Sequence, residues 1–142
     1  MKTTSWMILP LALLVSLASP AGAADDDQLS ADLRAVVEEQ VRAYDAEDLN
    51  GVLGTIHSRS PNYKSMRSAL GKQFEEQDLT VTLVDFRYMG HDDEFAVARV
   101  KTRVAGPAES GFQDNVVDEV LLFHREGALW KLWSDEMLSS AG

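Results

Sequence analysis

Residues 119–137, EVLLFHREGALWKLWSDEM, are the stretch that decides the fold. Apolar and aromatic residues run along both sides of the short turn REG, a pattern typical of two antiparallel strands joined as a hairpin. The second strand carries two tryptophans, Trp130 and Trp133. The stretch predicts a β-hairpin and raises the question of whether that hairpin walls a pocket or only backs a core.

Two more strands are expected before this hairpin. Residues 79–89 and 94–104 alternate with period two and are rich in β-branched and aromatic residues, and the turn GHDD joins them. With residues 113–124 and 128–137 as the third and fourth strands, the short connections predict an antiparallel meander.

Three helices are expected ahead of the sheet. Residues 29–45 place apolar side chains at helical spacing, Asp48 can cap a second helix ending near residue 57, and the pair Ser60-Pro61 can open a third that runs to about residue 77. Such helices must bury their apolar stripes on one face of the sheet. We therefore predict an α+β domain over residues 29–138, with three N-terminal helices packed on a four-stranded antiparallel sheet.

The N-terminus is typical of a secretory signal. One lysine precedes the apolar residues 6–18, and a proline and small residues follow, with Ala21-Gly22-Ala23 as the cleavage motif. The apolar run falls short of the ~20 residues that span a bilayer, which argues against a membrane anchor. We predict a signal peptide over residues 1–23, an acidic disordered leader over 24–28, a tail over 139–142, and export as a soluble periplasmic or extracellular protein.

Composition excludes several function classes. The chain of 142 residues has a net charge of −10, which disfavours binding to nucleic acid or to an anionic membrane. Cysteine is absent, so no disulfide can brace the fold, and no lipid can be attached to a cysteine after cleavage. Stability must come from the core of one domain.

The order of elements resembles the nuclear transport factor 2-like superfamily, whose fold is a cone with a curved sheet. Three stretches carry the resemblance: YDAEDLNGVLGTIH at the junction of the first two helices, GHDDEFAVARVKTRV in the first hairpin, and FHREGALWKLWSDEM in the last. The superfamily contains ketosteroid isomerases, scytalone dehydratases and SnoaL-like cyclases, and its sheets often pair as homodimers. The resemblance implies the fold, but it does not imply one activity.

The isomerase pattern itself is not met. The resemblance would place the oxyanion-hole tyrosine at Gln40, whereas Tyr44 lies one turn later. The short strand that supplies the catalytic aspartate in isomerases is replaced by SRSPNYKSMR, which leads directly into the third helix. Tyr44 and His57 remain as weak catalytic candidates.

The histidines and acids indicate no metal site and no cofactor. The three histidines form no metal-ligand spacing, and the acidic stretches lack the register of a calcium loop. His57, at the end of the second helix, is explained by the helix dipole, and the alternative is a proton carrier at a pocket mouth. Charged residues on the strands, Glu119 and Asp135 among them, are explained by an exposed, salt-bridged face, and the alternative is that some line the inside of the cone.

Bulky side chains predict a mainly apolar cavity between helices and sheet. The predicted lining is Gln40, Tyr44, Met66, Leu70, Phe74, Trp130 and Trp133. Within it, Tyr44 is expected to hydrogen bond to Gln40 one turn earlier.

Two functions follow. The first is an exported module that binds a small apolar ligand or a protein partner without evident catalytic machinery, as a homodimer through the sheet. The second is a cofactor-free isomerase, dehydratase or cyclase. A histidine or acid buried in the cavity with a shifted pKa would favour the enzyme.

Overall fold

The computed structural model describes residues 21–142, so residues 1–20 of the predicted signal peptide, which spans residues 1–23, lie outside the described part. Helices α1 (Ala21–Asp45), α2 (Leu49–Gly54) and α3 (Tyr63–Glu76) precede strands β1 (Thr80–His91), β2 (Phe95–Ala105), β3 (Asn115–Glu126) and β4 (Leu129–Ala141). The strands pair antiparallel in the order β1-β2-β3-β4. The predicted α+β class and the order of elements are confirmed.

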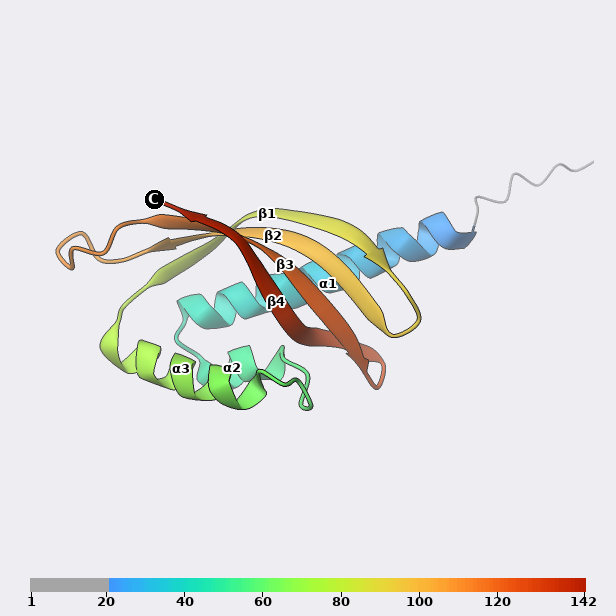
Figure 1. Ribbon diagram of the computed structural model, residues 1–142, viewed down its shortest axis with the longest axis horizontal. Helices are drawn as coiled ribbons and strands as arrows, with labels where there is room; N and C mark the ends of the chain where they lie inside the picture. Colours follow the sequence, from blue (N-terminus) through green and yellow to red (C-terminus); the bar gives the residue numbers. More distant parts are fainter. Residues whose placement is uncertain (1–20) are drawn as a thin grey trace, which may run out of the picture.

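The helices cover one face of the curved sheet. Figure 1 shows α1 lying along the sheet, with α2 and α3 below β4. Leu33 and Val37 of α1 are fully buried because the sheet face beneath them presents the small side chains of Ala96 and Ala98. Phe123 of β3, 0% exposed, is the largest fully buried side chain. The part of the concave face next to the first half of β4 therefore belongs to the hydrophobic core.

Several predicted boundaries need correction. Residues 24–28 belong to α1 rather than to a disordered leader, and β4 continues through the predicted tail to Ala141. Helix α3 begins at Tyr63, with Asn62 rather than the predicted Ser60 at the N-cap position, and the Ser60 hydroxyl donates to the Trp133 carbonyl oxygen at 2.6 Å. That bond holds the loop against β4.

A short bridge ties the segment after α2 to the sheet. Ile56 pairs in parallel with Leu132, with hydrogen bonds from the His57 amide to the Leu132 carbonyl and from the Leu132 amide to the Thr55 carbonyl, both 2.8 Å. A single bridge stands where the superfamily resemblance implies a strand. Within residues 21–142, no helix is long and apolar enough to cross a bilayer.

Candidate functional site

A cavity of about 350 Å³ lies between α1, α3 and the end of the sheet where β1 and β3 begin and where β2 and β4 end. Its volume falls within the range of small-molecule sites, about 300–1,000 Å³. Apolar side chains make most of the wall: Val41, Met66, Val81, Val104, Val117, Leu121, Leu132 and Met137. The polar lining is Gln40, Tyr44, Gln73, Thr102, Glu119 and Asp135.

Two carboxyl groups from neighbouring strands face this cavity. Glu119 lies two residues before the buried Leu121 on β3, and alternation along the strand points both side chains to the concave face. Asp135 reaches the same face because a register shift after Leu132 inserts an extra residue into β4. In the resulting register Asp135 pairs with Leu121, and Met137 pairs with Glu119.

The pKa of Glu119 is raised to about 7. Burial is the largest cause, and the negative charge of Asp135 and a hydrogen bond with that carboxyl add to it. In the part of the chain that the structure describes, no lysine, arginine or histidine lines this cavity to offset the charge. The Glu119 carboxyl therefore gains and loses its proton near neutral pH.

Tyr44 supplies a neutral hydroxyl beside this pair. Burial, followed by the charges of Glu119 and Asp135, raises the pKa of Tyr44 to about 12, so the phenol stays protonated. Its ring packs edge-on against Phe74, with centroids 5.8 Å apart. The predicted bond to Gln40 does not form; the Gln40 amide donates instead to Thr55 Oγ1 at 3.2 Å.

The other predicted pocket residues lie at different places. Met66 lines the cavity, whereas Leu70 is buried in the core, 3% exposed. Trp130 lines a separate groove of about 440 Å³ between α1 and the β3–β4 turn. Trp133 packs against His124, with ring centroids 4.9 Å apart.

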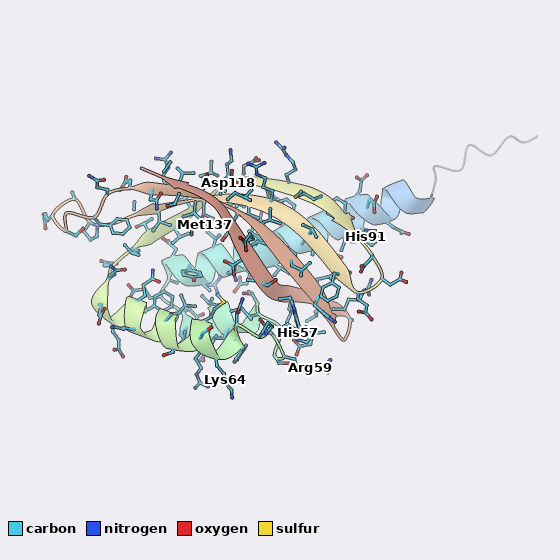
Figure 2. The ribbon with its side chains drawn as sticks, in the orientation of Figure 1. His57, Arg59, Lys64, His91, Asp118 and Met137 are labelled. Atoms are coloured by element: carbon cyan, nitrogen blue, oxygen red, sulfur yellow. The ribbon has the colours of Figure 1, made fainter. Side chains whose placement is uncertain are left out.

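His57 is a structural residue in this arrangement. It is 1% exposed, its Nε2 donates to the Arg125 carbonyl oxygen at 3.0 Å, and its Nδ1 accepts from the Arg59 amide at 3.0 Å. Figure 2 places it beside β4, and it is not part of the cavity wall. Both nitrogens are occupied, so His57 is not free to move protons to a ligand.

His91 lies at the β1–β2 turn, far from His57 (Figure 2). Its Nδ1 lies 2.5 Å from the Tyr88 hydroxyl and 3.3 Å from Asp26 Oδ1, which ties the turn to α1. Within residues 21–142, no three His, Cys, Asp or Glu side chains gather as metal ligands would.

Comparison with known families identifies the chain. Residues 35–141 match the family model described as "Anti-sigma-I factor RsgI9, C-terminal domain". The chain belongs to this family. The match of the RsgI9 C-terminal domain covers the C-terminal part of α1, the helices α2 and α3, and the whole sheet. No curated protein matches the sequence.

Solved structures share the fold of this RsgI9-type domain at low identity. An NTF2-like protein of unknown function from Pseudomonas putida KT2440 is 12% identical, with a TM-score of 0.63 over 81% of this chain and 86% of that one. A putative scytalone dehydratase from Novosphingobium aromaticivorans is 7% identical, with a TM-score of 0.65 over 83% and 90%. The nuclear transport factor 2-like fold predicted from the sequence is confirmed.

Bd1075 from Bdellovibrio bacteriovorus is also similar, at 15% identity and a TM-score of 0.65. The match covers 84% of this chain but only 44% of Bd1075. The fold therefore occurs there as one part of a longer chain.

The site combines apolar walls with a protonatable acid pair. Sequence reasoning placed Glu119 and Asp135 on strands but did not assign them to the cavity. The one usable signal was Glu119 itself, since it shares a parity with Leu121 and Phe123, two large apolar residues of the same strand. Asp135 gave no such signal, because the extra residue in β4 reverses its parity.

Proposed function

We propose that this domain binds a small molecule in the cavity lined by Tyr44, Glu119 and Asp135. The observation that carries the proposal is a largely apolar cavity with one polar spot, which is how small-molecule sites combine affinity with orientation.

A fragment screen by NMR tests this binding. Amide shifts of ¹⁵N-labelled protein should change at Gln40, Thr102 and Glu119 with small apolar fragments. Val104→Trp fills the cavity and should abolish those changes, whereas Val84→Trp, at a side chain 49% exposed and outside the cavity wall, should leave them. Hits that cluster elsewhere on the surface would contradict the proposal.

Acid–base catalysis is a second candidate, and the feature expected from the sequence to favour an enzyme, an acid in the cavity with a shifted pKa, is present in Glu119. A carboxyl with a pKa of about 7 is suited to take and return protons near neutral pH. The protonated Tyr44 hydroxyl can donate to an oxygen on which negative charge develops. The two groups together fit a cofactor-free isomerase, dehydratase or cyclase.

Deuterium exchange distinguishes this candidate from binding alone. The protein in D₂O should speed the exchange of α-protons of a cyclic ketone above the buffer rate, as followed by ¹H NMR. Glu119→Gln should remove the acceleration, and Glu136→Gln, on the same hairpin but outside the cavity wall, should retain it. Equal rates with and without protein would leave binding as the function.

Export and removal of residues 1–23 are also proposed, on the basis of the signal pattern. Intact-mass analysis of the exported protein should show a chain that starts at Ala24. Recovery of the uncleaved chain in a membrane fraction would contradict it.

We propose that the convex sheet face forms a homodimer. This face carries half-buried apolar side chains on β2, β3 and β4, among them Phe95, Leu122 and Trp133, with no helix of the described chain over them. Sedimentation at micromolar concentration should give twice the monomer mass, and Leu122→Arg should give a monomer. A monomeric wild-type protein would refute the dimer.

A further inference from the structure

Two consecutive acids of β3, one on each face of the sheet, have different charged neighbours. On the convex face, Asp118 receives two hydrogen bonds from the Arg99 guanidinium, at 2.9 Å and 2.7 Å. The next residue, Glu119, faces the cavity and lies beside another carboxyl, Asp135. Arg99 thus neutralises Asp118, whereas none of the residues that line the cavity is a basic partner for Glu119.

No element around the cavity, within residues 21–142, supplies that missing positive charge. Helix α1 contributes Gln40, Val41 and Tyr44, and α3 contributes Met66 and Gln73. Strands β1 and β2 contribute valines and a threonine. The titratable groups that face Glu119 are therefore Asp135 and Tyr44.

We propose that the cavity binds an organic ammonium ion, with its charged head between Glu119 and Asp135 and its apolar body against Val41, Met66 and Leu121. This inference rests on the proposed small-molecule function and assigns the ligand class. An ammonium group offers three N–H donors, enough for both carboxylates, and the Tyr44 ring can add a cation–π contact. Met66 and Met137 adapt to varied hydrocarbon shapes.

Other ligand classes fit less well. A calcium ion takes six to eight oxygen ligands, whereas two carboxylates and mostly apolar walls face this cavity. A sugar could bond to the neutral polar side chains Gln40, Gln73 and Thr102, but it brings no positive charge to the two carboxyls. An anion would meet the acid pair directly. A cation with an apolar body satisfies both the charge and the wall.

Binding of an ammonium ion should be linked to proton release. In the free cavity Glu119 is largely protonated below about pH 7, and the cation favours the ionised Glu119 carboxylate, so the proton leaves as the ligand enters. Affinity should therefore rise with pH up to about 7, where Glu119 ionises, and then level off. It should fall again only near pH ~10, where alkylamines lose their charge.

Calorimetry with three matched probes tests the inference: 2-phenylethylammonium, neutral 2-phenylethanol and anionic 3-phenylpropionate. At pH 7.5 the ammonium should bind at least about tenfold tighter than the alcohol, as expected for a charge-assisted hydrogen bond. Its affinity should drop more than about tenfold at pH 5.5, because one proton must be displaced. Titrations in two buffers of different ionisation heat should show that proton.

Substitutions of the two acids test whether they cause the ammonium preference and its pH dependence. Glu119→Gln should remove both the ammonium preference and the pH dependence, and Asp135→Asn should move the midpoint to lower pH because one cause of the raised pKa is gone. Glu136→Gln, which removes the same charge outside the cavity wall, should change neither. Circular dichroism confirms that each variant is folded.

The outcomes separate the inference from the proposed function. Equal or tighter binding of the alcohol or the carboxylate overturns the ammonium assignment and leaves small-molecule binding intact. Failure of all three probes to bind the folded wild-type protein at millimolar concentration overturns both.

Discussion

Glu119→Gln should stabilise the protein, and by more at high pH than at low pH. Folding raises the pKa of Glu119 from 4.5 to about 7. At about 1.4 kcal/mol for each pKa unit, the ionised carboxylate costs the native state about 3 kcal/mol. The folded state holds the proton more tightly than the unfolded state, so wild-type stability falls as pH rises from about 4.5 to 7 and is level above that.

Urea denaturation at pH 5.5 and 8.5 measures the difference and avoids the isoelectric point near 4.6. About 2 kcal/mol of the penalty should accumulate between these two pH values, so the advantage of Glu119→Gln over wild type should grow by that amount. The glutamine amide introduced at this position can still donate to Asp135, which keeps the packing comparable. Glu136→Gln is the control and should show no such growth.

An advantage for Glu119→Gln that is the same at both pH values would refute the reasoning. It would mean that the Glu119 carboxyl is as well solvated in the folded protein as in the unfolded chain. The cavity around Glu119 would then be open to water. The proposal of a cationic ligand would lose its electrostatic basis.

Four further substitutions test the local geometry, each by urea denaturation. His57→Leu should cost roughly 1–3 kcal/mol, because it removes the two hydrogen bonds that the buried imidazole makes with the Arg125 carbonyl and the Arg59 amide, and an effect below about 0.5 kcal/mol would refute the structural role. Glu47→Gly should stabilise by about 0.5–1 kcal/mol, because Glu47 follows the end of α1 with a φ of 53°, and no gain would show that this strain is absent. Gly51→Ala should lower the stability by about 1 kcal/mol, because the new Cβ would come 2.5 Å from the capping Asp48 carboxylate. Gly54→Ala, with open space around it, should raise the stability by up to about 1 kcal/mol. Stability changes of the same sign for both variants would refute the close approach.

The sheet was predictable because its strands follow a simple alternation. On β2, Ala96, Ala98 and Val100 are buried while their neighbours are half exposed, as period two requires. The existence of the second and third helices was predictable from the spacing of their apolar residues. The Asp48 cap is confirmed by its bond to the Gly51 amide at 2.9 Å. Local patterns sufficed wherever the backbone stays regular.

The cavity was less predictable because β4 does not stay regular. Trp130 and Leu132 point to the core, and strict alternation would put Met137 on the other face, with Trp133. The extra residue after Leu132 instead turns Asp135 and Met137 inward. No glycine or proline in LWSDEM marks this shift, so the acid pair could be recognised only once the strands were paired.

His57 shows a second limit of sequence reasoning. Its position after α2 suggested a helix dipole or a pocket mouth, yet its partners come from residues 59 and 125. The partner on β3 is 68 residues away and depends on how the loop meets the sheet. Contacts at such separations carry no local signature.

The bridge between Ile56 and Leu132 also bears on how the sheet avoids self-association. An exposed edge strand is a template for another chain, and this open sheet has two edges, β1 and β4. The loop carrying Thr55 and His57 occupies both backbone groups of Leu132, and the Ser60 hydroxyl occupies the Trp133 carbonyl, so the β4 edge is blocked at these two residues. Loosening this loop would free the backbone groups of Leu132 and Trp133 to pair with another chain, which would favour aggregation through β4.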